Sequence, residues 1–200
     1  MRKFLPWIVV GGILLIAVVW FVNIKNGAVK TNQEVNKEWG NVETSYQRRN
    51  DLIGNLVETV KGAAEFEKST LEAVTSARAS ASQVKIDPTN ITPEQLAQFN
   101  QAQSGVSSSL SRLLVTVENY PDLKANQNFL KLQDELASTE NQILTARTRF
   151  NEAVQKYNNY ILVFPNSMFL GNYKEKPYFD AVAGAEKPVD VKFNFSKDKK

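Results

Sequence analysis

Arginine, asparagine and glutamate side chains near predicted core positions are the residues of this sequence that offer chemistry for a binding site. Arg49 occupies a position that should face the core, and a buried guanidinium needs an acidic partner, for which Glu140 and Glu58 are candidates. A polar seam between helices would bind a small anionic ligand, a lipid head group or a partner's carboxylate. The predicted seam consists of Arg49, Asn55, Arg78, Glu140, Asn141, Arg147 and Asn151. The simpler interpretation is a structural ion pair, or an arginine whose head group reaches out of the protein.

The composition excludes most familiar catalytic centres. The chain has no histidine and no cysteine, so it cannot form a Ser-His-Asp triad, a zinc–thiolate site or a histidine-ligated haem. Adjacent carboxylates such as Asp134 and Glu135 point about 100° apart on a helix, and no base accompanies the serines between Ser104 and Ser111. We therefore predict no catalytic residue, no metal and no cofactor. An enzyme that uses only glutamate and lysine is the third of three function hypotheses.

Nucleic acid is not an expected partner. The formal net charge is +3, and no basic stripe continues around the pair Arg48-Arg49. Most aromatic residues of the soluble part recur at helical spacing, which favours packing in a core over stacking on bases.

An uncharged apolar run of 21 residues, Phe4 to Ile24, has the length of one helix across a bilayer. A cleaved signal peptide is the competing interpretation, but no small-residue cleavage site follows the run. Positive charges nearly balance across the span, and Arg2 and Lys3 directly before it slightly favour a soluble domain on the extracytoplasmic side. The sequence therefore predicts a single-pass membrane protein that contacts the membrane through this helix.

Three stretches after the apolar run show apolar residues at alternating spacings of three and four, within residues 32–63, 96–117 and 129–164. A shorter stretch with the same spacing lies within residues 71–81. A mean period of 3.5 places each set on one stripe of a helix, and such stripes bury themselves against one another in bundles or coiled coils. The pattern predicts an all-α fold with an antiparallel helical bundle.

Prolines and one glycine mark the expected helix boundaries. Thr92-Pro93 should begin a helix, Pro121 should separate two helices, and Phe164-Pro165 should end the last one. Residues 29–84 are either one helix or two helices that divide near Gly62, where the stripe slips. We favour the division, which gives four antiparallel helices, over three long ones.

The number of helices decides where the chain ends. With four helices the chain leaves the membrane, returns, leaves and returns again, so Phe164-Pro165 should lie close to the bilayer. The basic tail would follow, and Lys197, Lys199 and Lys200 could touch anionic head groups. With three helices the tail would end far from the membrane.

Several segments of the chain after the apolar run are distinctive. They read NKEWGNV around Trp39, RRNDLIGNLVETVKG from Arg48 to Gly62, ARASA from Ala77, ENYPDLKAN from Glu118 to Asn126, FLKLQDELASTENQILTARTRFN from Phe129 to Asn151, YNNYILVFP up to Pro165, and PYF from Pro177. In this order, and over nearly the whole chain after the apolar run, they resemble the LemA family of bacterial membrane proteins. One segment departs from the family, which usually has LIPNL where this chain has LIGNL at residues 52–56. Gly54 can keep a local bend that proline would impose, but does not fix one.

The resemblance implies an N-terminal membrane helix and an antiparallel bundle in the bacterial inner membrane, with no defined biochemical activity. The expected domains are an anchor at 1–28, a LemA-like helical bundle at 29–184 and a polar, frayed tail at 185–200. The leading function hypothesis is a non-enzymatic scaffold that recruits another protein, and a homo-oligomer is compatible with it. The alternative is a sensor that binds a small anionic ligand or a lipid head group in the seam between helices.

Overall fold

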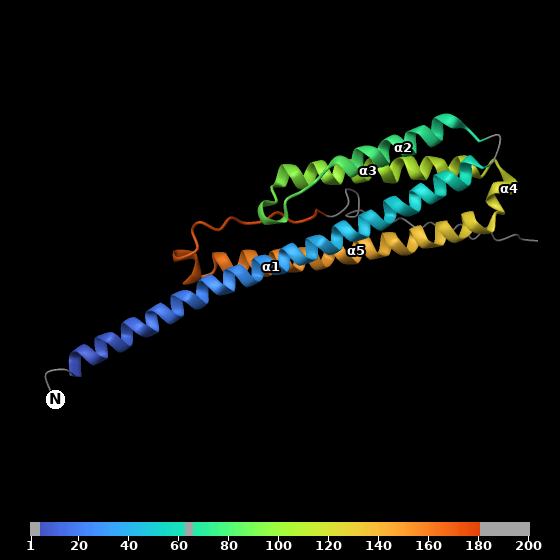
Figure 1. Cartoon of the computed structure of the whole chain (residues 1–200). Helices are drawn as coiled ribbons and strands as arrows, with labels where there is room; N and C mark the ends of the chain where they lie inside the picture. The colour runs from blue at the N-terminus through green and yellow to red at the C-terminus, as the bar shows by residue number, and fades with distance from the viewer. Residues whose placement is uncertain (1–4, 63–65, 181–200) are drawn as a thin grey trace, which may run out of the picture.

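The computed structural model describes residues 5–62 and 66–180, and within these ranges the protein is helical and contains no strand (Figure 1). The five α-helices are α1 (Leu5–Lys61), α2 (Lys68–Gln83), α3 (Pro93–Val117), α4 (Pro121–Lys124) and α5 (Gln127–Leu162), joined in part by the 3₁₀ turns η1 (Pro88–Asn90) and η2 (Asn166–Met168). The all-α prediction is confirmed. The favoured division near Gly62 is confirmed as well, because α1 ends at Lys61 and α2 is a separate helix. The short helix α4 was not expected.

Helix α1 combines the predicted membrane span and the first bundle helix in one element of 57 residues. Among the described helices it is the one long and apolar enough to cross a membrane, with a mean hydropathy of 1.9 over its most apolar window and almost none of that window buried. Ile24 and Ala28 are already buried in the bundle core. The helix has no break at residue 28, so the predicted domain boundary there corresponds to no change in backbone structure. Phe4 and the predicted tail 185–200 lie outside the described residues.

The ends of α3 and α5 follow the local chemistry of the sequence. The Thr92 hydroxyl accepts from the Gln95 amide N–H at 3.2 Å, and the Gln95 side chain accepts from the Thr92 N–H at 3.0 Å, which forms a capping box. Pro93 occupies the first turn of α3, as predicted. Asn126 caps α5 by accepting from the backbone N–H groups of Asn128 and Phe129. The predicted boundary at Pro121 is observed as well, because α3 ends at Val117, Pro121 begins α4, and α5 begins at Gln127.

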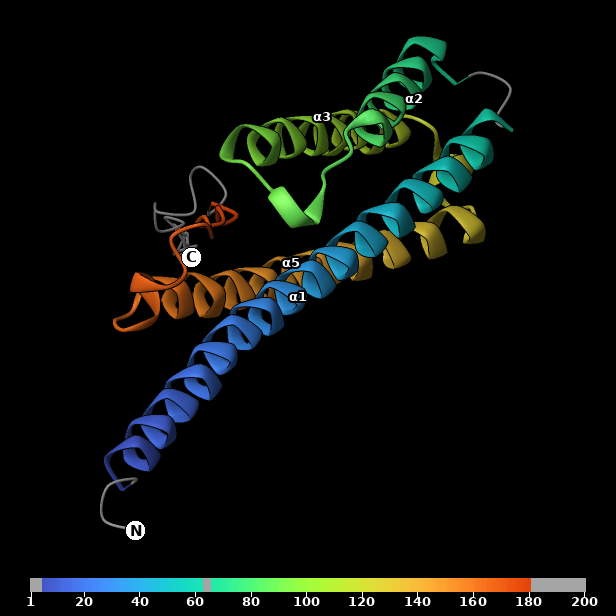
Figure 2. The same ribbon diagram turned by 60° about the vertical axis from the view of Figure 1, so that its left-hand side comes forward.

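The helices pack as two pairs, α1 along α5 and α2 along α3. Figures 1 and 2 show the shorter α2–α3 pair lying over the part of α1 and α5 that is far from the N-terminus. The buried apolar residues accordingly form two clusters. A distal cluster joins the ends of α1 and α3 and the start of α5 with α2. A membrane-proximal cluster joins residues 24–46 of α1 with residues 143–161 of α5 and with the segment 170–179, and it also contains Ile86 and Ile91 of the α2–α3 loop and Leu96 and Phe99 of α3.

Helix α5 returns to the end of the membrane span. The Tyr160 hydroxyl donates to the Ile24 carbonyl at 3.1 Å. Gly27 makes this contact possible, because a Cβ at that position would collide with the Tyr160 hydroxyl. The chain therefore follows the path expected for four helices and brings Pro165 back to the membrane side. The tail lysines of that prediction lie outside the described residues.

Because Ile24 and Ala28 are buried in the bundle core, the point at which the chain is truncated should affect its stability. A chain that begins at residue 23 keeps Ile24 and Ala28 in the core, and we expect it to be soluble and helical. A chain that begins at residue 29 loses about 2–3 kcal/mol of apolar burial and should unfold roughly 5–10 °C lower. Thermal unfolding followed by circular dichroism compares the two. Equal midpoints would mean that the bundle core does not include this end of α1.

Candidate functional site

Arg49 is the most deeply buried charged side chain of the described residues, at 2% exposure. Its Nη1 donates to Glu140 Oε1 and to Ser107 Oγ, both at 3.2 Å. Its Nη2 donates to the side-chain oxygen of Gln103 and, at 3.5 Å, to the Gln103 carbonyl. Three helices thus supply the site: Arg49 comes from α1, Gln103 and Ser107 from α3, and Glu140 from α5. The other predicted partner, Glu58, instead pairs with Lys61 at 2.6 Å.

The Tyr46 ring completes this polar layer. The Arg49 guanidinium lies 4.9 Å from the ring centroid, a cation–π distance. Burial raises the pKa of the Tyr46 phenol above its ordinary value of 10, while the positive charges of Arg147 and Arg49 pull the pKa down. Burial thus makes the Tyr46 phenol harder to ionise than a free tyrosine.

The polar layer separates the two apolar clusters and holds three helices in register. Arg49, Gln103 and Thr139 each interrupt the apolar stripe of their own helix, and all three are buried. The guanidinium has five N–H donors. Its two Nη groups make four hydrogen bonds to groups of the same chain, and its Nε has no partner among the described residues. An anionic ligand would have to displace Glu140 or Ser107, so the layer as it stands serves packing.

We predict that Arg49→Ala destabilises the protein by roughly 3 kcal/mol, because it leaves a cavity and the buried Gln103 oxygen without a donor. Arg49→Met should cost less, since the methionine side chain fills most of the space. Chemical unfolding of the full-length protein in detergent micelles measures both.

The matched control is Arg48→Ala, which removes the same side chain from the neighbouring exposed position. It should change the free energy of unfolding by no more than about 0.5 kcal/mol. An Arg49→Ala effect as small as that of Arg48→Ala would contradict the structural role of the layer.

Two asparagines of α5 hold the segment after η2 in an extended conformation. Asn158 donates to the Lys176 carbonyl and accepts from the Lys176 N–H, both at 2.9 Å. Asn151 makes the same pair with Phe179, at 3.0 and 2.8 Å. Seven helical residues span about 10.5 Å and three extended residues about 10 Å, so the two spacings match. We call residues 170–180, which run antiparallel to α5, the C-terminal strap.

Lys176 fixes the strap to η1. Its Nζ donates to the Pro88 carbonyl at 2.7 Å and to the Thr89 carbonyl at 3.3 Å. Burial lowers the pKa of the Lys176 ammonium, and the Asp87 carboxylate partly opposes this. The lysine thus joins the loop between α2 and α3 to the strap.

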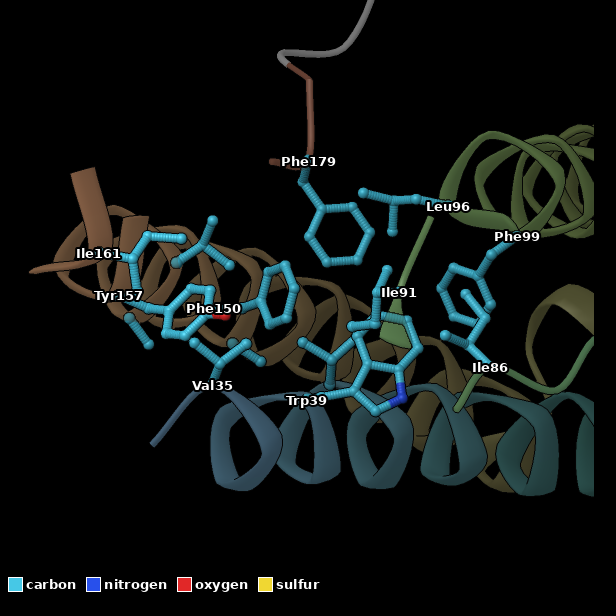
Figure 3. Close-up of a cluster of buried hydrophobic side chains, with 14 of the residues drawn as sticks. Val35, Trp39, Ile86, Ile91, Leu96, Phe99, Phe150, Tyr157, Ile161 and Phe179 are labelled. Atoms are coloured by element: carbon cyan, nitrogen blue, oxygen red, sulfur yellow. The ribbon is translucent and has the colours of Figure 1, made fainter. Parts of the chain in front are cut away.

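Phe179 fixes the far end of the strap in the membrane-proximal cluster. Figure 3 shows its ring pointing from the strap toward Phe150 and Trp39. The ring centroids lie 5.3 Å from Phe150 and 6.0 Å from Trp39. Arg147 covers the outer face at 4.6 Å and donates to the Asp180 carbonyl at 3.0 Å. Arg147 and Asn151, two residues of the predicted seam, therefore both bind the strap.

We predict that Asn158→Ala releases the strap, because the buried N–H and carbonyl of Lys176 lose their partners at a cost of about 1–3 kcal/mol. Hydrogen exchange of residues 174–180, followed by mass spectrometry, should become markedly faster. Asn159→Ala alters the exposed neighbour and serves as the control. Unchanged exchange in Asn158→Ala would show that Lys176 and Phe179 hold the strap without the amide.

The structure does not gather all seven predicted seam residues in one place. Arg49 and Glu140 pair in the polar layer, and Arg147 and Asn151 bind the nearby strap. The other three lie elsewhere. The Arg78 guanidinium rests against Gly54, and α1 continues through Gly54 without interruption. Asn55 is exposed on α1, and Asn141 lines a surface groove between α1 and α5.

Sequence reasoning missed Asn158, Lys176 and Phe179. A signal for Asn158 was present, because Asn151 and Asn158 each follow an aromatic core position and lie one heptad apart. Phe179 lies in the PYF segment that resembles the family, but neither Phe179 nor Lys176 shows a periodicity, since an extended segment without a partner strand has none to detect.

The fold and the site define a class: a helical bundle that continues into an N-terminal span and whose buried polar groups bind the chain itself. Within this class the chain belongs to the LemA family, whose sequence profile matches residues 38–193. It is similar to Protein LemA of Metamycoplasma hominis, with 26% identity over 76% of this chain and 67% of the relative. It is also similar to magnetosome proteins MamQ 2 of Paramagnetospirillum magneticum and MamQ of Magnetospirillum gryphiswaldense, each 25% identical over 82% of this chain and 67% of the relative. None of these names specifies a reaction. The chain is thus a LemA-type membrane protein.

Proposed function

We propose that this protein is a non-enzymatic scaffold, in which a helical rod holds a partner-binding surface at a fixed distance from the membrane. The observation that carries the proposal is the continuity of α1 from the apolar span to the distal end of the bundle. The 37 residues from Lys25 to Lys61 extend about 55 Å at 1.5 Å per residue. A flexible tether would allow the bundle to tumble, whereas a continuous helix fixes its axis relative to the span.

The α1–α5 groove is the surface that best suits a partner. It has a volume of about 520 Å³, and α1 and α5 alone contribute to it. Its lining consists mainly of short polar side chains, which permit close approach of another chain and provide both hydrogen-bond donors and acceptors. They are Asn41, Thr44, Ser45, Ser138, Asn141, Gln142 and Thr145, together with Ala146 and Arg149. Asn141 thus belongs to a partner surface in this proposal.

The extracytoplasmic side is the better place for the rod. Arg2 and Lys3 directly precede the apolar run, which supports a cytoplasmic N-terminus.

The absence of histidine and cysteine from the sequence supports a non-enzymatic role, because it removes the commonest nucleophiles, bases and metal ligands.

The scaffold proposal is tested by photo-crosslinking in intact membranes. A photoreactive residue at Asn141 or Thr145 of the full-length protein should yield one discrete crosslinked species, whose mass distinguishes another protein from a second copy of this chain. The same residue at Ser76, exposed on α2, is the control and should yield none. Adding Ser138→Arg should abolish the crosslink by filling the groove.

A second candidate function is the ligand sensor, which one observation favours. A pocket of about 600 Å³ lies between α1 and the α2–α3 pair, beside the polar layer. Asn50 lines it, and the Asn50 side-chain oxygen is buried without a partner among the described residues. Two basic residues, Arg48 and Lys85, lie at the same pocket, together with the carboxylates of Glu43 and Asp51. Thermal stabilisation by an anionic metabolite, together with no crosslink from the groove, would favour the sensor over the scaffold.

A further inference from the structure

The turn that follows α5 exposes an unusual amount of apolar surface. Helix α5 ends at Leu162, and the chain turns through η2 to Phe169. Phe164 and Met168 are 74% and 69% exposed, and Leu162 and Val163 are each more than half exposed. Adjacent bulky apolar side chains in water are costly, so this surface calls for a covering medium.

This apolar turn lies against the membrane span itself. The Phe169 ring is 5.5 Å from that of Trp20 and 5.8 Å from that of Phe21, both in edge-to-face geometry. Trp20 lies four residues before Ile24, where the bundle core begins, which is about 6 Å along the helix toward the bilayer. The turn therefore reaches past the start of the bundle and down the side of the span.

The charge pattern of the sequence agrees with this position. Residues 157–173 contain no aspartate, glutamate, lysine or arginine, and Lys156 and Lys174 bracket them. Lys25 stands at the same level, with its Nζ 5.7 Å from the Phe21 ring centroid and 5.5 Å from that of Tyr173. An uncharged segment between basic residues is the pattern of a chain that enters the boundary between acyl chains and head groups.

We propose that residues 162–169 form a second membrane contact, inserted into the interfacial region of the bilayer beside the α1 span. The apolar surface of the turn continues onto Trp20 and Phe21 of the span, which Phe169 contacts and which are both exposed in the protein. A covering protein would have to occupy both surfaces, whereas the bilayer covers both at once. The protein then contacts the membrane at two points, and α5 as well as α1 is fixed to it.

The test uses the full-length protein in phosphatidylcholine–phosphatidylglycerol vesicles. Because the native chain has no cysteine, Phe164→Cys and Met168→Cys each carry one environment-sensitive fluorophore. Leu144→Cys is the matched control, an apolar residue of α5 that is 64% exposed and lies well away from the turn. Val18→Cys, within the span, is the positive control. Lipids that carry a quencher at a shallow or a deep acyl position are then added to the vesicles.

Labels at residues 164 and 168 should lose emission strongly, with the shallow quencher acting more than the deep one, and the label at residue 144 should not respond. The Val18 label should respond to both quenchers. Emission at 164 and 168 that no lipid quencher reduces, while Val18 responds, would overturn the proposal. Blue-shifted emission without quenching would in addition identify a protein surface as the cover.

Discussion

The buried guanidinium of Arg49 is the constraint on which the arrangement of the helices depends. A charge at 2% exposure requires hydrogen-bond acceptors, and α3 and α5 supply those of the two Nη groups at only one axial position. Sliding α3 or α5 by one turn would move the acceptors about 5.4 Å away. Apolar stripes alone tolerate such a slip, because one leucine replaces another in the same groove. The polar layer therefore selects one register among several that the apolar stripes permit.

The strap solves a problem of unequal lengths. α1 and α5 form a long pair, whereas α2 has only 16 residues and α3 has 25. The α2–α3 pair lies over the distal part of the long pair (Figure 2), and of these two shorter helices only the start of α3, with Leu96 and Phe99, reaches the membrane-proximal cluster. The strap completes this cluster: Leu170 and Phe179 enter the core, and Asn151 and Asn158 satisfy the backbone. An extended segment held by side-chain amides thus covers apolar surface that a longer helix would otherwise cover.

The helices were predictable because their signals are local and repeated. The 3.5-residue period identified the stripes, and prolines with Thr92 identified the boundaries, so every residue of the 96–117 stripe that the period selects is buried. The partner of Arg49 was predictable only as a pair of candidates, since the choice between Glu140 and Glu58 depends on the axial register of α5. The strap was not predictable, because its order derives from contacts with α5 and η1. Pro177 disfavours a helical conformation at Lys176, but it does not specify what the segment packs against. Arg78 and Asn55 were predicted for the seam but lie outside it. Helical spacing shows which residues share a face of a helix, but it does not show which helix that face contacts.

Two contacts along α5 bear on whether the bundle could transmit a signal along its length. Near the membrane, Tyr160 donates to the Ile24 carbonyl through a gap that exists only because residue 27 is glycine. Farther along the same helix pair, Glu140 binds Arg49. A sliding motion of α5 against α1 would break both contacts together, and the strap, which bonds to α5 and to η1, would resist it as well. Signal transmission needs two arrangements of similar free energy. Here two polar contacts between α1 and α5 specify the same register, and the strap adds polar contacts between α5 and η1, which favours a rod of one fixed geometry and therefore a scaffold over a switch.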